Sequence, residues 1–217
     1  MQDKSANLEI LLGQGVIAVV RAASSEEALK IVDALREGEI KTIEITMTVP
    51  GALKVMEEVT KKLGHDILLG AGTVLDAETA RLSILSGAQF VVSPCLDLDL
   101  IRICQRYSTI VIPGAMTPTE ILQAWQAGAD LVKVFPAGNL GGPSYIKAIK
   151  APLPQVLLNP TGGVNLNTTA DFIRAGASVI SAGSALVDKQ AIKEANFQVI
   201  TEKAGKFLEE VRRGREN

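Results

Sequence analysis

Short runs of β-branched residues alternate with longer amphipathic stretches along the whole chain, and this alternation constrains the fold more than any other feature. Such runs are typical of strands. We expect eight of them, over residues 16–21, 41–46, 67–70, 90–93, 109–113, 131–135, 156–159 and 179–182. A helical pattern or a helix start signal follows each run, as in parallel strands joined by crossover helices. Eight such units in 217 residues predict a single α/β domain, residues 1–217, folded as a closed (β/α)8 TIM barrel.

Glycines recur where a helix should end and the next strand should begin. Gly87, Gly128 and Gly176 are each followed by alanine, and Gly38 is expected to have the same role earlier. A glycine just after a helix readily adopts the left-handed conformation that ends it. An open doubly wound sheet is the competing fold, but no G-x-G-x-x-G motif opens the first helix.

Two helices are expected outside the repeated units. Residues 4–13 should form a short extra helix across the bottom of the barrel. Residues 190–213 carry an apolar face that is typical of one C-terminal helix. No linker or low-complexity segment interrupts the sequence, so we expect one domain.

Composition excludes several classes of function. The chain has 22 basic and 24 acidic residues, which argues against a nucleic-acid partner. No apolar run approaches the roughly 18 residues that a membrane span needs. Residues 1–7 lack the basic-then-apolar order of a secretory signal. We therefore expect a soluble cytoplasmic protein without a membrane partner.

The cysteines and the histidine restrict the chemistry further. The only histidine is His65, and the only cysteines are Cys95 and Cys104, nine residues apart. We therefore expect neither a His-ligated catalytic zinc site nor a Ser-His-Asp or Cys-His triad. Mg²⁺ held by carboxylates stays open. Chemistry is expected to depend on lysine, arginine, carboxylates, hydroxyls and backbone amides.

Lys133 is the most informative candidate residue. Side chains alternate across a strand, so Lys133 shares a face with Leu131 and Phe135, while the valines between them point the other way. If the valines face the helices, the lysine lies inside the barrel. Two interpretations remain open: a lysine neutralised by an internal carboxylate, or a lysine whose pKa is lowered by desolvation so that its neutral amine attacks a carbonyl.

The first two predicted strands supply charged partners. Isoleucines alternate with Thr42, Glu44 and Thr46, which predicts that Glu44 points into the barrel. Glu44 could simply pair with a cation, or it could be a general acid and base beside the lysine. Arg21 ends the first strand and is either part of a salt bridge at the rim or a clamp for an anion.

Glycine-bearing segments follow the third, seventh and eighth predicted strands, at residues 70–73, 161–164 and 182–185. Glycines also make ordinary tight turns. However, the loops after strands seven and eight are where barrels commonly bind phosphate through backbone N–H groups. The substrate is therefore expected to carry a phosphate.

Eight motifs occur in order along the chain. They are Arg21 after Val-Ile-Ala-Val-Val, Ile43-Glu-Ile-Thr46, Gly70-Ala-Gly-Thr-Val74, Val92-Ser-Pro94, Pro113-Gly-Ala-Met-Thr-Pro118, Lys133-Val-Phe-Pro136, Pro160-Thr-Gly-Gly-Val164 and Gly183-Ser-Ala-Leu186. Together they resemble the 2-keto-3-deoxy-6-phosphogluconate (KDPG) / 4-hydroxy-2-oxoglutarate aldolases. The resemblance runs from about Val16 to Val187, which is most of the chain.

The resemblance implies a metal-free, cofactor-free class I aldolase that acts on small molecules and assembles as a homotrimer. It implies that Lys133 is the Schiff-base lysine and Glu44 the acid/base that moves protons. It further implies a set of substrate-binding residues. Thr73 and its loop would hold the pyruvate carboxylate, Pro94 and Phe135 would wall the pocket, and the phosphate would be received by Arg21, Gly162, Gly163 and Ser184.

Two further positions bear on specificity. Thr161 matches the residue that the family associates with preference for the gluconate-derived substrate over its galactonate C4 epimer. Thr48 stands where some members have an arginine that contacts the pyruvate carboxylate. Either Thr48 and the Thr73 loop bind that carboxylate by hydrogen bonds, or Arg21 contacts it as well.

The predicted reaction is cleavage of KDPG to pyruvate and glyceraldehyde 3-phosphate. Cleavage of 4-hydroxy-2-oxoglutarate and decarboxylation of oxaloacetate are expected as further activities of the same machinery. The alternatives are an aldolase for the galactonate epimer, a phosphate-binding isomerase or epimerase without a covalent lysine, and a non-catalytic barrel that binds sugar phosphates.

Overall fold

The computed structural model describes residues 3–64 and 66–216, so that His65 and the outermost residues of the chain lie outside the description. Each of the eight predicted runs overlaps a strand. The strands are β1 (Val16–Val20), β2 (Thr42–Thr46), β3 (Leu68–Gly72), β4 (Phe90–Val92), β5 (Ile110–Ile112), β6 (Gly114–Ala115), β7 (Val132–Val134), β8 (Leu158–Pro160) and β9 (Ile180–Ala182). The short strand β6 has no counterpart in the prediction.

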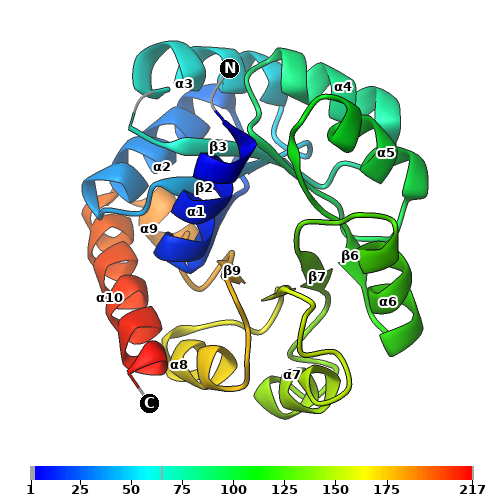
Figure 1. Ribbon diagram of the computed structural model, residues 1–217. Coiled ribbons are helices and arrows are strands. Elements are labelled where there is room, and N and C mark those ends of the chain that lie inside the picture. Colours follow the sequence, from blue (N-terminus) through cyan, green and yellow to red (C-terminus); the bar gives the residue numbers. More distant parts are fainter. Residues whose placement is uncertain (1–2, 65, 217) are drawn as a thin grey trace.

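The helices alternate with these strands, except that β6 directly follows β5 and α10 directly follows α9. They are α1 (Lys4–Gln14), α2 (Ser25–Glu37), α3 (Ala52–Leu63), α4 (Ala77–Leu85), α5 (Leu98–Arg106), α6 (Pro118–Gln126), α7 (Pro143–Lys150), α8 (Leu166–Arg174), α9 (Lys189–Lys193) and α10 (Gln198–Arg215). Figure 1 shows most of them arranged around the strands. No helix in the described ranges is both long and apolar enough to cross a membrane.

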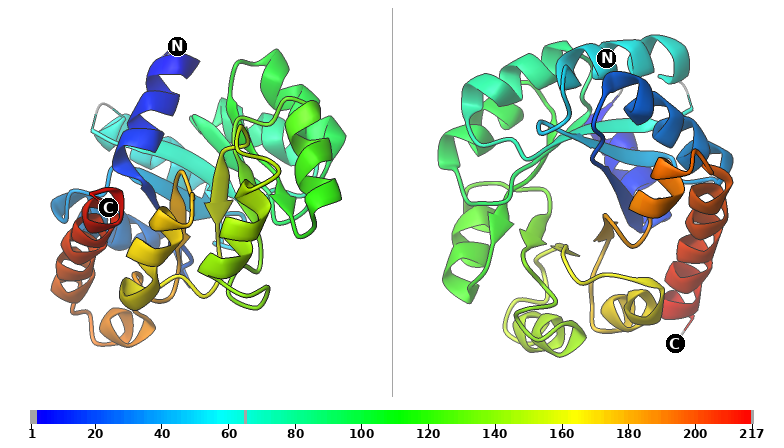
Figure 2. Two further views of the ribbon diagram at one scale, coloured as in Figure 1. Left: turned by 60° about the horizontal axis from the view of Figure 1, so that its bottom comes forward. Right: turned by 180° about the vertical axis from the view of Figure 1, so that it is seen from behind.

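The prediction of one C-terminal helix over residues 190–213 is wrong, because two helices occupy this region. Ala195 lies between α9 and α10 with a φ of 53°, in the left-handed region that interrupts a helix. The break lets α10 turn and pack against α8 and α2. Figure 2 shows α9 and α10 as separate segments.

The strands are parallel and form two curled sheets. One has the order β5-β4-β3-β2-β1-β9 and the other the order β6-β7-β8. The α/β fold with a parallel sheet is confirmed, whereas the strands in the described part of the chain do not pair continuously around a closed eight-stranded barrel. Pro113 separates β5 from β6, and proline has no N–H with which to continue a strand ladder.

Backbone contacts bridge the two places where the sheets meet. The Lys133 N–H donates to the Pro113 carbonyl at 2.9 Å. At the other side, the Ser178 N–H donates to the Leu158 carbonyl at 2.9 Å, and Thr161 forms an isolated parallel bridge with Ser181.

Two apolar clusters lie on the two faces of the strands. The inner one consists of Leu11, Ile17, Leu68, Phe90, Val92, Ile110, Ile112, Leu131 and Val179. Leu11 belongs to α1, so the predicted extra helix does close one end of the strands, as Figures 1 and 2 show. The outer cluster fills the space between strands and helices. The inner cluster leaves the other end of the strand interior to polar side chains.

The predicted helix-ending glycines are left-handed at three of four positions. Gly87, Gly128 and Gly176 have φ values of 104°, 92° and 102°. Gly38 has a φ of −83°, and Glu39 takes the left-handed conformation instead, with a φ of 67°. A β-carbon at Gly38 would collide with the Thr201 carbonyl, so close packing against α10 accounts for glycine there.

Candidate active site

Lys133 and Glu44 lie inside the curled sheets, on opposite sides of the strand interior. Lys133 on β7 is 4% exposed and Glu44 on β2 is 1% exposed. Burial lowers the pKa of the Lys133 amine, and the charge of Glu44 offsets this in part. Burial raises the pKa of the Glu44 carboxyl, and Lys133 and then Arg21 offset that in part. Both groups are therefore shifted toward their uncharged forms.

The carboxyl group of Glu44 has space because Gly72 on β3, two residues beyond the register partner Gly70, has no side chain. The carboxylate lies directly above Gly72, because a β-carbon built on this glycine would overlap Glu44 Oε1. Glu44 Oε2 is buried and has no hydrogen-bond partner among the described residues. A carboxyl oxygen that is not committed to the protein can exchange a proton with a bound molecule.

The aromatic ring of Phe135 lies close to both Lys133 and the glycine-bearing loop after β8. The Lys133 Nζ lies 5.2 Å from the centroid of the Phe135 ring, within the range of a cation–π interaction. A β-carbon at Gly162 would lie 3.5 Å from the same ring. The ring thus stands between the amine and the glycine-bearing loop.

A cavity of about 120 Å³ lies at the C-terminal ends of β1, β7, β8 and β9. Six residues predicted for substrate binding line it together, namely Arg21, Phe135, Thr161, Gly162, Gly163 and Ser184. The Arg21 guanidinium lies against Gly183, where a β-carbon would be 3.3 Å from Nη1. One cation therefore faces a cavity whose other walls combine backbone and hydroxyl groups with the apolar side chains of Val19, Phe135, Val164 and Ala185.

Two left-handed glycines shape the loop after β8. Gly162 and Gly163 have φ values of 87° and 77°, which favour glycine. The Gly162 carbonyl accepts a hydrogen bond from the Gly138 N–H at 2.8 Å. The Gly163 carbonyl accepts from Thr168 Oγ1 at 3.3 Å and from Asn165 Nδ2 at 3.4 Å. With both carbonyls occupied, the N–H groups are the polar groups that this loop can offer to an anion.

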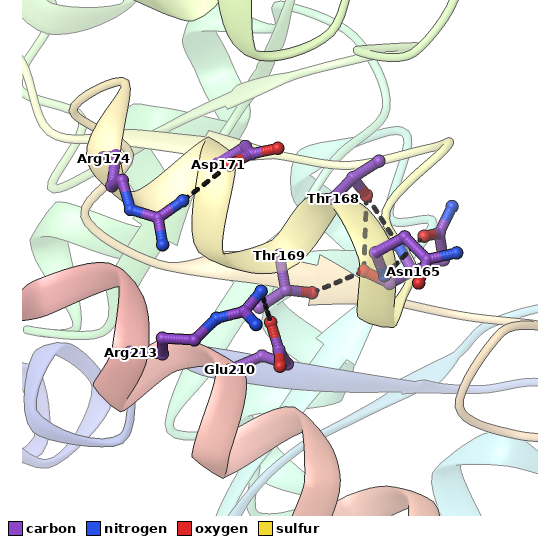
Figure 3. A network of polar contacts seen from close by, with 8 residues as sticks. Asn165, Thr168, Thr169, Asp171, Arg174, Glu210 and Arg213 are labelled. Carbon is purple, nitrogen blue, oxygen red and sulfur yellow. Dashed lines mark hydrogen bonds and ion pairs between the residues drawn. The ribbon is translucent and has the colours of Figure 1, made fainter.

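Helix α8 anchors this loop. Asn165 caps α8, accepting a hydrogen bond on its side chain from Asn167 N–H, while its own N–H donates to Thr168 Oγ1 at 3.0 Å. Thr169 Oγ1 donates to the Asn165 carbonyl at 2.8 Å. Figure 3 shows Thr168 and Thr169 directed at Asn165, with the ion pairs of α8 and α10 farther along.

The segment after β9 forms a single helical turn. The Gly183 carbonyl accepts hydrogen bonds from the N–H groups of Leu186 and Val187, at 2.9 and 2.8 Å. Ser184 is the next residue after Gly183 in this turn and is exposed. The first N–H groups of a helical turn have no partner within it, so they can bind an acceptor from outside.

Three predicted binding residues lie outside this cavity. Thr73 follows Gly72, is half-buried, and has a φ of 55°. Pro94 packs its carbonyl against Gly114, the register partner of Lys133. Thr48 is exposed and its hydroxyl lies 2.7 Å from that of Thr46. These residues follow β3, β4 and β2, at the same end of the strands as the cavity.

Asn159 and Ser181 are buried polar residues that the sequence interpretation did not single out. Asn159 Oδ1 accepts hydrogen bonds from Thr161 Oγ1 at 3.0 Å and from Ser181 Oγ at 2.9 Å. The available signal was the alternation in Leu158-Asn159-Pro160-Thr161, which places Asn159 and Thr161 on one face.

The described residues also define what the site can hold. Across residues 3–64 and 66–216, no group of three or more histidine, cysteine, aspartate or glutamate side chains could hold a metal ion. The groups that the site does present are an amine, a carboxyl group, a guanidinium, hydroxyls and backbone amides.

Comparison with known proteins adds independent findings. Residues 8–203 match the family model described as KDPG and KHG aldolase. The 2-dehydro-3-deoxy-phosphogluconate aldolase of Treponema pallidum is 36% identical over 186 residues, covering 86% of this chain and 88% of the relative. The 2-dehydro-3-deoxy-6-phosphogalactonate aldolase of Escherichia coli is 35% identical over 172 residues, covering 79% and 83%.

A solved structure is similar over nearly the whole chain. It is a KDPG aldolase from Legionella pneumophila with pyruvate captured as a covalent carbinolamine intermediate. Its TM-score is 0.85 at 30% sequence identity, covering 92% of this chain and 96% of that one.

Proposed function

Because this chain belongs to the KDPG and KHG aldolase family, we propose that it is a class I aldolase that cleaves KDPG to pyruvate and glyceraldehyde 3-phosphate. Its named relatives are aldolases, which are lyases. The observation that carries the proposal is the burial of Lys133 and Glu44 together, with both pKa values shifted toward the uncharged forms. A neutral amine is the form of lysine that attacks a carbonyl.

The proposed reaction begins at Lys133. Its neutral amine adds to the C2 carbonyl of the substrate, and a proton passes from nitrogen to oxygen to give a carbinolamine. Glu44, as a carboxylic acid, donates a proton to the C2 hydroxyl, which leaves as water. The products of this step are a cationic iminium on Lys133 and a carboxylate on Glu44. The Phe135 ring lies where its face can stabilise that cation.

Carbon–carbon cleavage returns the proton to Glu44. The carboxylate removes the proton from the C4 hydroxyl, the C3–C4 bond breaks, and its electrons neutralise the iminium as an enamine. Glyceraldehyde 3-phosphate leaves. Glu44 then protonates C3, and water, deprotonated by Glu44, adds to C2 and releases pyruvate. Each cycle ends with a neutral lysine and a protonated glutamate. Acid–base assistance of this kind contributes ~10²–10⁴ in rate.

The remaining predicted residues receive proposed roles at the cavity. Arg21, Ser184 and the N–H groups of Gly162 and Gly163 would bind the phosphate, since they line one cavity. Thr73 and its loop would bind the pyruvate carboxylate, with Pro94 as a wall. Thr48 would assist through its hydroxyl, because its link to Thr46 holds it at the end of β2.

Borohydride trapping tests the proposal directly. Incubation with pyruvate and sodium borohydride should add a reduced pyruvyl group, and peptide mapping should place it on Lys133. Lys133→Ala should abolish both the adduct and cleavage, whereas Glu44→Gln should still form the adduct but cleave KDPG far more slowly. An isomerase or a non-catalytic barrel would bind phosphorylated ligands without forming any adduct. That result would refute the aldolase assignment.

The galactonate epimer is a second candidate substrate. It is favoured by the similarity to the phosphogalactonate aldolase of Escherichia coli, whose identity is close to that of the phosphogluconate aldolase relative. Thr161 favours the gluconate epimer by the family resemblance. The ratio of kcat/KM for the two C4 epimers decides between them.

We also propose that the chain forms one domain with a closed eight-stranded barrel and assembles as a homotrimer. The backbone contacts of Lys133 and Ser178 between the sheets support closure, and slow exchange of these two N–H groups would test it. Large apolar side chains exposed on or beside α4, α5 and α6 support assembly, namely Leu75, Leu82, Leu85, Leu98, Met116 and Trp125. Light scattering measures the oligomeric state, and a monomer would refute the trimer.

A further inference from the structure

Asn159 occupies a position directly beside the lysine, inside the strand interior. It is 0% exposed, and it is the register partner of Lys133 across β7 and β8. Its Oδ1 accepts hydrogen bonds from Thr161 Oγ1 at 3.0 Å and from Ser181 Oγ at 2.9 Å. One buried amide oxygen therefore binds two hydroxyls that both line the 120 Å³ cavity.

These hydrogen bonds determine what Thr161 can offer to a ligand. The Thr161 N–H donates to the Val134 carbonyl at 2.9 Å, and the Thr161 carbonyl accepts from the Ala137 N–H at 2.8 Å. A hydroxyl has one hydrogen and two lone pairs. Because Asn159 receives that hydrogen, only a lone pair of Thr161 Oγ1 remains for the cavity. The same holds for the hydroxyl of Ser181.

We propose that Asn159 is a positioning residue for substrate specificity: it makes Thr161 and Ser181 hydrogen-bond acceptors toward the cavity, so that the site selects a sugar acid with a hydroxyl donor placed there. A C4 epimer whose hydroxyl points elsewhere cannot satisfy this acceptor. This inference rests on the proposed function, because it identifies the partner as a substrate hydroxyl.

The other end of the amide supports this assignment. Asn159 Nδ2 is buried and has no hydrogen-bond partner among the described residues. An unpaired buried donor is unfavourable, and an apolar side chain of the same shape would avoid it. Packing alone therefore does not account for asparagine at this position, whereas its hydrogen bonds to the hydroxyls of Thr161 and Ser181 do.

Two isosteric variants separate the acceptor from the shape of the side chain. Asn159→Leu removes the acceptor, and Asn159→Asp retains it. The measurement is the ratio of kcat/KM for KDPG to that for its C4 epimer, with the purified full chain. We expect Asn159→Leu to lower this ratio about tenfold, the equivalent of one hydrogen bond. Asn159→Asp should stay within about threefold of the wild-type ratio. Any effect on Lys133 cancels in the ratio, because both substrates react at the same amine.

Pyruvate trapping is the matched control. Pyruvate has no C4 hydroxyl, so Asn159→Leu should still form the reduced pyruvyl adduct on Lys133. Loss of trapping in this variant together with a wild-type epimer ratio, at an unchanged melting temperature, would show that Asn159 acts on Lys133 instead and would overturn the proposal. A wild-type protein that neither traps pyruvate nor cleaves KDPG would refute the proposed function itself, which is a different result.

Thr161→Val keeps the proposal testable if Asn159→Leu does not fold. Valine has the shape of threonine without the hydroxyl, so this variant should lower the epimer ratio to the same extent. The double variant should lower it no further, because both changes remove one interaction. Any one of three results would overturn the proposal. The epimer ratio could stay unchanged in Thr161→Val, or the wild-type ratio could be near one. Alternatively, the ratio of Asn159→Asp could be as low as that expected for Asn159→Leu.

Discussion

The carboxylate of Glu44 lies directly above the α-carbon of Gly72 on the neighbouring strand, in space that any other residue at position 72 would fill. Gly72→Ala should therefore displace the carboxylate from the reacting atoms. We expect KDPG cleavage to fall about 100-fold, as an ångström-scale misplacement of a catalytic group typically causes. We also expect ~1–3 kcal/mol of destabilisation from overpacking. Steady-state kinetics and chemical unfolding measure the two effects.

Gly205→Ala is the control for this substitution. A β-carbon at Gly205 on α10 would meet no atom within 4 Å. Alanine is also the better helix former, by about 1 kcal/mol. This variant should keep full activity and unfold at a slightly higher temperature. If Gly72→Ala retained wild-type turnover, the placement of the Glu44 carboxylate above Gly72 would be wrong.

The burial of Lys133 predicts a conflict between activity and stability. Lys133→Met removes an amine whose pKa is lowered by desolvation, and it leaves an apolar side chain of similar length. We expect no pyruvate adduct and a melting temperature at neutral pH that is higher by about 2–4 °C, which corresponds to ~1 kcal/mol in a domain of this size. Differential scanning calorimetry tests this.

The stability difference between Lys133→Met and the wild type should depend on pH. Between the lowered pKa of the folded protein and the ordinary lysine value of 10.5, the unfolded state binds more protons at this amine. The wild type therefore gains stability as pH rises through that window, and the variant does not. The stability advantage of Lys133→Met over the wild type should therefore shrink as the pH approaches 10.5. An advantage that grew with pH would mean that the pKa of Lys133 is raised, not lowered.

Glu44→Gln provides a separate test of the coupling between the two groups. The charge of Glu44 raises the pKa of Lys133 and so opposes the effect of burial. Glutamine removes that charge without removing volume. The pH at which pyruvate trapping reaches half of its maximal rate should therefore move to lower pH in Glu44→Gln. A move to higher pH would contradict this coupling. No move would mean that Glu44 is already protonated when pyruvate binds, as its role as the first acid requires.

Local periodicity predicted the inward direction of Glu44 and, on the condition that the valines of its strand face the helices, that of Lys133. Each lies in a strand whose other residues alternate with it, so the outer helices select the apolar face and leave the polar one inside. The sequence does not predict how far apart these two side chains lie across the interior. β2 and β7 are not neighbours in either sheet, so no local sequence pattern fixes that distance.

The missed features depend on contacts between segments that are distant in sequence. The predicted strand ended at Asn159, whereas β8 continues to Pro160. The prediction therefore missed that the side chains of Asn159 and Thr161 point toward the same inner face. The break before α10 lies at Ala195, a residue with no preference for its left-handed conformation. Packing of α10 on α8 and α2 imposes it.

The two cysteines should differ sharply in reactivity. Cys104 is fully buried, and burial raises the pKa of its thiol to about 12, so the reactive thiolate is absent at neutral pH. Cys95 is exposed. Ellman's reagent should therefore modify one thiol per native chain, and both thiols only after unfolding. Modification of two thiols in the native protein would show that α5 opens readily.

The phosphate role of Arg21 gives a prediction that separates binding from chemistry. Arg21 lines the cavity with Ser184 and the glycine loop, and its guanidinium lies against Gly183. Arg21→Ala should raise KM for KDPG about 10- to 100-fold, the range expected for lost charge-assisted hydrogen bonds. Pyruvate carries no phosphate, so adduct formation with pyruvate should remain.

Arg102→Ala controls for loss of a surface charge, because Arg102 is exposed on α5 and pairs only locally with Asp99 in the described contacts. It should leave KM unchanged. The charge of Arg21 also lowers the pKa of Lys133, so Arg21→Ala should move the pH dependence of trapping slightly upward. An unchanged KM for KDPG with a shifted trapping profile would mean that Arg21 acts on Lys133 alone and that another group binds the phosphate.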